Sequence, residues 1–161
     1  MRDRIDEYFN SLPDDYTITF YSCAVFITNA INALVMNNIV YSCLFTCLFI
    51  TSVVMRMYRN IYTIILDKII IGLVILYGGK LFLDKVNNDG IFKNLLLNGL
   101  IILTFLLTIF LYSYGYIIGS YCFGENGEVW HGFMHCISSF GHHLILFLWF
   151  TEEVYKKIYK S

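Results

Sequence analysis

The chain has 161 residues, of which 58% are hydrophobic and 14% are charged, and its net charge at pH 7 is −1. Soluble domains average about 25% charged residues, so a mean hydropathy of +0.64 excludes an ordinary soluble domain and indicates an integral membrane protein. The net charge says nothing about partners, but no basic patch of the nucleic-acid-binding type appears, so no nucleic-acid partner is expected.

Five stretches are apolar enough, and at about 20 residues long enough, to cross a bilayer as helices. We expect these spans at residues 17–36, 39–57, 61–77, 94–113 and 131–151. They leave no room for a soluble domain, so residues 1–161 are predicted to form a single all-α transmembrane domain, a polytopic helix bundle. The third span has the least certain end, because Gly78 and Gly79 either stop it or let it bend onward through the LFLDK motif.

The first sixteen residues are acidic and contain no apolar h-region, so we expect no cleavable signal peptide and insertion directed by the first span. An odd number of spans places the termini on opposite faces. Arg and Lys counts near the span ends favour an N-terminus that is lumenal or outside and a C-terminus in the cytosol, and we expect the protein in an endomembrane. The N-terminal side carries Arg2, Arg4, Arg56 and Arg59, and the other side carries Lys80, Lys85, Lys93, Lys156, Lys157 and Lys160.

The cysteines are odd in number, lack CxxC spacing and lie mostly inside spans. This pattern indicates small apolar residues of the bundle rather than disulfides or metal ligands. The five are Cys23, Cys43, Cys47, Cys122 and Cys136.

Polar side chains inside a bilayer are costly and normally face the interior of a helix bundle, so each one marks a candidate site. In the second span Ser52 and Arg56 lie one turn apart on a single face, and in the fifth span His131 and His135 do the same. Asp67 lies inside the third span. Because successive spans alternate in direction, these five residues lie at similar depth near one surface, and we expect their side chains to converge.

The HxxxH pair has two interpretations. Two histidines at i and i+4 both reach one zinc ion, and a third ligand with a water molecule completes a catalytic site. Alternatively, both imidazoles lie at the membrane interface and meet water or a backbone carbonyl. His142 and His143 lie about 10 to 12 Å further along the helix axis, too far from His135 to share the same ion.

The other polar residues also have ordinary explanations. Arg56, near the end of its span, can snorkel toward the headgroups, and Ser52 can bond back to the carbonyl at position 48. Asp67 is harder to explain in this way, because a carboxylate within an apolar stretch needs a partner or a proton. Its cationic candidates are Arg56, a metal ion and Lys68.

The spacing of these residues is similar to a known pattern. Ser52 and Arg56 stand four residues apart, Asp67 follows eleven residues later, and His131 and His135 form the last pair. This resembles the alkaline ceramidases and the wider superfamily of seven-helix membrane hydrolases, which carry SxxxH, Asp and HxxxH on the corresponding helices. The resemblance covers about residues 14–70 and 130–148, and shorter motifs agree: TFY at 19–21, LD at 66–67 and Gly141.

The resemblance implies a zinc-dependent hydrolase that cleaves a sphingolipid amide, with a ceramide-like membrane lipid as its partner. It makes His131 and His135 zinc ligands, Asp67 the general base and Ser52 a hydrogen-bond donor to the developing oxyanion. Zinc chemistry suits this role, because the ion lowers the pKa of bound water to about 7 and polarises a carbonyl.

Two departures from the family pattern change these expectations. Five spans instead of seven remove one wall of the lipid pocket, which is then open to the bilayer or supplied by another copy of the chain in a homo-oligomer. Arg56 stands at the position of a zinc histidine, and a guanidinium has no lone pair with which to bind zinc. No calcium site is carried over, since Ala24 replaces a carboxylate that would accompany Asp14 and Asp15.

Three functions therefore compete. The chain is a reduced zinc hydrolase in which Asp67 serves as the third ligand, a combination of two histidines and a carboxylate that catalytic zinc sites use. Alternatively, it is a catalytically degenerate lipid-binding protein in which an ion pair between Arg56 and Asp67 replaces the metal. In the third alternative, the polar cluster only locks the helices of a structural membrane protein together.

Overall fold

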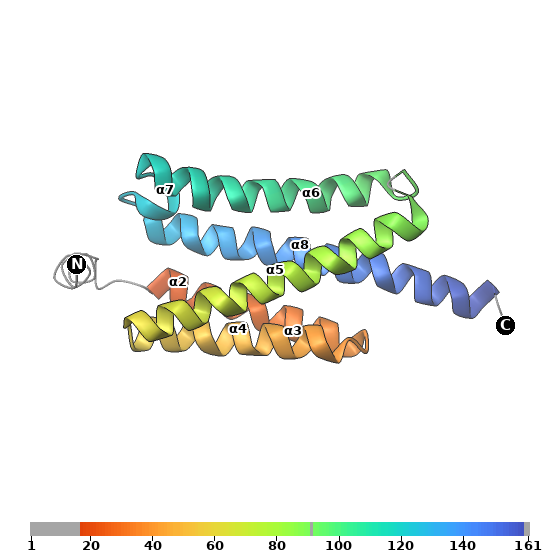
Figure 1. Cartoon of the computed structure of the whole chain (residues 1–161), viewed down its shortest axis with the longest axis horizontal. Helices are drawn as coiled ribbons and strands as arrows, with labels where there is room; N and C mark the ends of the chain where they lie inside the picture. The colour runs from red at the N-terminus through yellow and green to blue at the C-terminus, as the bar shows by residue number, and fades with distance from the viewer. Residues whose placement is uncertain (1–16, 91, 160–161) are drawn as a thin grey trace.

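The computed structural model describes residues 17–90 and 92–159, and these form helices and short connections without a strand. The described residues form five long helical rods, and short turns join them at the two ends of the bundle (Figure 1). In chain order the elements are α2 (Thr17–Ser22), α3 (Val25–Val35), α4 (Ile39–Met57), α5 (Ile61–Asp89), α6 (Leu95–Ile109), the π-helical turn η1 (Phe110–Tyr114), α7 (Gly115–Ile118), the 3-10 turn η2 (Tyr121–Phe123) and α8 (Gly127–Tyr159).

Four segments of the described chain are long and apolar enough to cross a membrane: Ile18–Val35, Ile39–Met57, Ile61–Asp89 and Leu95–Ile118. The fifth rod, α8, carries all four histidines and packs against helices of this set. The expected all-α transmembrane bundle is confirmed, and the chain belongs to the class of multi-pass helical membrane proteins.

Several boundaries differ from the expected ones. The first span is interrupted at Cys23 and Ala24, which separate α2 from α3. The third does not end at residue 77, because α5 passes through Gly78 and Gly79 and continues to Asp89. Beyond the glycines its last turns are held by an ion pair, with Lys85 Nζ 2.8 Å from Asp89 Oδ2. The last helix begins at 127, before the expected start at 131.

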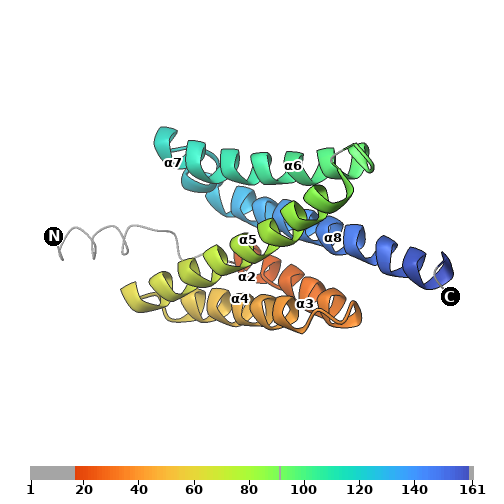
Figure 2. The ribbon, with the colours of Figure 1, turned by 45° about the vertical axis from the view of Figure 1, so that its right-hand side comes forward.

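The packing places α8 at the centre. It contacts α2, α3, α5 and α6, while α4 packs between α3 and α5. Two views show α4 and α6 on opposite sides of α8, while α5 crosses diagonally from the end of α4 to the start of α6 (Figure 1, Figure 2). The apolar core shared by α3, α4, α5 and α8 is built around buried Phe26, Tyr41, Phe45, Val74 and Leu146.

Polar bonds fix the register of α8 against α3. Asn29 Nδ2 donates to Ser139 Oγ at 2.6 Å, and both side chains are buried. One turn further along, His143 bonds with both Thr28 and Asn32 of α3, at 3.0 and 2.9 Å. Interhelical hydrogen bonds of this kind contribute to membrane bundles, where lipid tails give helices little hydrophobic reason to associate.

The described chain begins at one end of the bundle and ends at the other (Figure 1). The end at which α2 starts also holds the last turns of α4, the first turns of α5 and the first turns of α8 (Figure 1). This alternation brings the polar positions of three helices to one end. The acidic segment expected at residues 1–16 lies outside the described residues.

Candidate functional site

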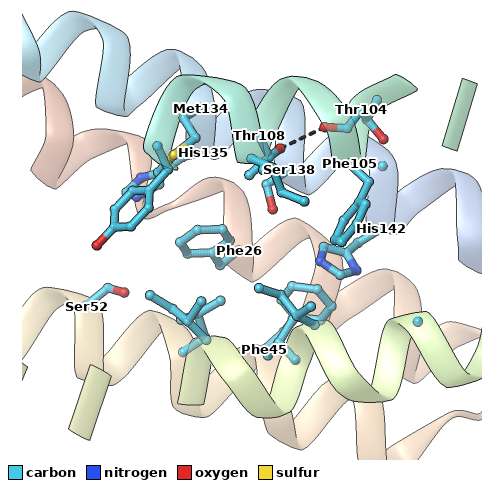
Figure 3. Close-up of a pocket in the computed structure, with 18 of the residues that line it drawn as sticks. Phe26, Phe45, Ser52, Thr104, Phe105, Thr108, Met134, His135, Ser138 and His142 are labelled. Atoms are coloured by element: carbon cyan, nitrogen blue, oxygen red, sulfur yellow. Dashed lines mark hydrogen bonds between the residues drawn. The ribbon is translucent and has the colours of Figure 1, made fainter. Parts of the chain in front are cut away.

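A cavity of about 600 Å³ lies inside the bundle, and we call it the central cavity. Residues of α3, α4, α5, α6, η1 and α8 line it. Figure 3 shows Ser52 and His135 toward one end, Phe26 and Phe45 between, and His142 toward the other end. Most of its wall is apolar, which is the usual character of a pocket for a lipid or another small molecule.

The structure brings all five candidate residues to this one cavity. Ser52, Arg56, Asp67, His131 and His135 all line it, although they come from three different helices. They occupy the end near the start of α2, as the alternation of spans leads one to expect. The same end also holds Lys68, from α5.

A buried hydrogen bond joins Ser52 to Asp67. Ser52 Oγ donates to Asp67 Oδ1 at 2.6 Å, and the two residues are 2% and 3% exposed. Thr51 Oγ1 lies 3.2 Å from the same carboxylate oxygen. Two hydroxyls of α4 therefore hold the carboxylate of α5, and Ser52 does not bond back to its own helix.

Arg56 does not pair with Asp67. Its Nη1 donates instead to the backbone carbonyl oxygen of Ser52 at 2.9 Å, and its buried Nε has no hydrogen-bond partner. Among the ion pairs of the described residues, none includes Arg56 or Asp67. The expected direct ion pair is wrong because the carboxylate is already taken by the hydroxyls, while the guanidinium turns to its own helix.

His135 is oriented by α2. Its Nδ1 lies 2.8 Å from Ser22 Oγ, whose own hydroxyl donates to the carbonyl oxygen of Thr19 at 2.8 Å. Since that hydroxyl has a single hydrogen, Nδ1 must be the donor, and Nε2 is left with its lone pair. The His131 ring lies edge-on to the His135 ring, with centroids 4.9 Å apart.

The other two histidines have separate roles. His143 bonds to α3 through both ring nitrogens and belongs to the helix contacts described above. His142 lines the central cavity and bonds through Nδ1 to the hydroxyl of Tyr41. Its ring also packs edge-on against Phe45, with centroids 5.1 Å apart. Neither shares an ion site with His135.

The residues of the central cavity do not fit a resident catalytic zinc ion. Such sites take three protein ligands and a water molecule, whereas His131 and His135 supply only two and Arg56 cannot serve as a third. Within residues 17–90 and 92–159, no group of three or more His, Cys, Asp or Glu side chains is placed to hold a metal. Asp67 is not available as the missing ligand, because its carboxylate is held by Ser52 and Thr51.

The apolar part of the cavity is long and reaches the outer surface. Along α5 the lining of the cavity runs from Asp67 to Leu83, about 24 Å at 1.5 Å per residue. Ile75 and Leu83 of α5 and Phe105 and Ile109 of α6 line the cavity and are exposed, and α5 and α6 are not among the closely packed helix pairs. The central cavity is therefore open between α5 and α6 on the side that faces lipid.

Several contacts of the site were missed from the sequence. Ser22 gave no signal, since a serine in a span normally bonds to its own helix, as its second contact does. Thr51 directly precedes Ser52, but neighbouring residues on a helix point about 100° apart, so Thr51 is not expected on the same face. Tyr41 is one of 13 tyrosines in the chain, and nothing in its neighbourhood in the sequence points to His142.

No family model, no curated protein and no solved structure matches this chain. The resemblance to the alkaline ceramidases therefore rests on the spacing of the polar residues, and it stays a prediction.

Proposed function

We propose that the protein binds a membrane lipid in the central cavity. The observation that carries the proposal is a cavity within a transmembrane bundle that is apolar over most of its length, polar at one end and open between α5 and α6. Its lining extends over about 24 Å of α5, against about 15 Å for half of the hydrocarbon core. An acyl chain fits this space, with the lipid head at the polar end.

Binding is favoured over zinc-dependent hydrolysis because the donor set lacks a third ligand. The hydrolysis of a ceramide-like amide, with Ser52 and Asp67 in catalytic roles, stays a prediction. One observation favours it: the Nδ1 of His135 donates to a hydroxyl, as zinc-bound histidines commonly do to a supporting group. The purely structural alternative does not explain why the polar cluster faces a cavity.

The proposal includes the membrane in which the protein acts and its orientation there. The protein acts in an endomembrane, with the polar end of the cavity on the lumenal or outer side and the lysine-rich end in the cytosol. The charges near the span ends support the orientation, and the resemblance supports the endomembrane. The open side faces bilayer lipid, while a second copy of the chain that covers it is the alternative.

A cavity-filling variant tests the proposal. Gly79 lines the central cavity, and a Cβ added there meets no atom within 4 Å, so Gly79→Phe places a ring in the lipid space. Gly72 lies on the same helix, has the same freedom for an added Cβ and does not line the cavity, so Gly72→Phe is the matched control. Each protein is purified in mild detergent, and the bound lipid is extracted and measured by mass spectrometry.

We expect the wild-type chain and Gly72→Phe to carry lipid at near one molecule per chain. Gly79→Phe should carry on the order of tenfold less, which corresponds to about 1.4 kcal/mol of binding free energy. Equal lipid in both variants, or none in the wild type, would contradict the proposal.

A further inference from the structure

The charges that line the central cavity do not balance. Arg56 and Lys68 are two cations, and Asp67 is the single acidic residue in its lining. With neutral imidazoles the lining therefore carries one net positive charge. A charge inside a bilayer is costly and normally meets a counter-charge, so the excess is a property of the site that needs an explanation.

Neither cation forms an ion pair among the described residues, and the carboxylates whose charges act on Arg56 are those of Asp67 and Glu128, without direct contact. Arg56 is held by one backbone carbonyl, and its Nε is buried without a hydrogen-bond partner. Asp67 is already held by two hydroxyls of α4. The guanidinium thus keeps donors for a further group, and its planar fork matches the oxygens of a phosphate or carboxylate better than any neutral head group.

Lys68 lies at the open side of the cavity. Its Nζ lies 4.7 Å from the centroid of the Tyr112 ring, so the side chain reaches from α5 toward η1. None of the ion pairs of the described residues includes it. Both Lys68 and Tyr112 line the cavity at the end that holds Arg56. A lipid that enters between α5 and α6 brings its head close to both cations.

We propose that the lipid bound in the central cavity carries an anionic, phosphate-class head group, held by Arg56 and Lys68, with its acyl chain along the apolar wall. This rests on the proposed lipid-binding function and names the class of lipid.

Competition binding on the purified full-length chain in detergent tests the proposal. Radiolabelled long-chain phosphatidic acid is the probe, and its competitors are diacylglycerol with the same chains and inorganic phosphate. The charge is removed in Arg56→Gln and Lys68→Gln and kept in Arg56→Lys. Lys80→Gln is the matched control, since Lys80 lies on α5, outside the cavity, and is 70% exposed.

We expect phosphatidic acid to bind at least tenfold more tightly than diacylglycerol. Arg56→Gln and Lys68→Gln should each remove most of this preference, Arg56→Lys should keep part of it, and Lys80→Gln should keep all of it. Lys68→Gln changes an exposed residue, so its result does not depend on whether Arg56→Gln folds.

Three results would overturn the inference. Equal affinity for the two lipids in the wild type excludes an anionic head group and leaves lipid binding intact. Inorganic phosphate that competes as well as phosphatidic acid identifies a free anion as the ligand. Binding of neither lipid, together with equal extracted lipid in Gly79→Phe and Gly72→Phe, is instead a failure of the proposed function itself.

Discussion

Ser52 of α4 donates a 2.6 Å hydrogen bond to Asp67 of α5, and this bond joins two helices inside the membrane at the polar end of the central cavity. Both residues are buried in the bundle. The bond gives Asp67 a stable position without a metal or a cation in contact. A polar residue in a span is thus satisfied by a neighbouring helix, as the cost of burying it demands.

Ser52→Ala should destabilise the bundle by about 1 to 3 kcal/mol, because it leaves a buried acceptor of Asp67 with only the longer bond from Thr51. Reversible unfolding in mixed micelles, followed by circular dichroism, measures the change. Thr51→Val is the matched control and should cost less, since its bond is 3.2 Å and its hydroxyl also contacts the carbonyl oxygen of Leu48. A larger loss in Thr51→Val than in Ser52→Ala would contradict this ranking.

Gly78→Ala should also destabilise the bundle. An added Cβ would lie 2.5 Å from the hydroxyl oxygen of Tyr41 and 3.0 Å from the His142 ring, so the bond between these two residues must shift or break. Overpacking of this kind costs about 1 to 3 kcal/mol. The same unfolding measurement checks it.

Gly72→Ala provides the control for this prediction. It is on the same helix and meets nothing within 4 Å, so it should be neutral or stabilise by up to about 1 kcal/mol through helix propensity. If both alanines have the same effect, the close approach of α5 to Tyr41 and His142 is wrong.

The fold could be predicted because apolar composition and span length are local properties of the sequence. Four segments that the structure makes long and apolar enough to cross a membrane overlap the first four expected spans. The end of α5 could not be predicted, since a glycine such as Gly78 usually weakens a helix. Here it is required by tertiary packing, as its missing side chain makes room for Tyr41 and His142.

The grouping of the site residues could also be predicted, because alternation of spans fixes the depth of each polar position. The partner of each residue could not. Arg56 and Asp67 line the same cavity, but sequence spacing does not tell that Ser52 takes the carboxylate and that Arg56 turns to a backbone carbonyl. The partner of a side chain depends on where its atoms lie to within about one ångström. A pattern of spans does not contain this information.

The positions of the ends give a third prediction. With α8 as a fifth span, a tag at the N-terminus and a tag at the C-terminus should lie on opposite sides of the membrane, the N-terminal one lumenal or outside. Protease protection of sealed vesicles that carry one tag at a time measures this. Both tags on the same side would mean that α8 does not span the membrane. His131 and His135 would then not lie at the same depth as the polar residues of α4 and α5.

The fourth prediction concerns the position that separates this chain from a zinc site. Arg56 lines the same cavity as His131 and His135, and it is the residue that stands where the resembled family has a zinc histidine. Arg56→His would supply the third imidazole and remove a cation that repels a metal ion. We expect wild-type protein to bind well under one zinc per chain and Arg56→His to approach one, as measured by elemental analysis after dialysis against a weak chelator.

His135→Ala in the Arg56→His background is the control, because it returns the site to two imidazoles and should lose the gained zinc. The same variants are assayed for release of fatty acid from a labelled ceramide, where a gain confined to Arg56→His would support the hydrolase ancestry that the spacing indicates. One zinc per wild-type chain, unchanged by Arg56→His, would mean that Asp67 leaves its hydroxyl partners to ligate the metal. In that case the two cations of the cavity would no longer point to an anionic lipid, because the metal and its carboxylate would set the charge of the site instead.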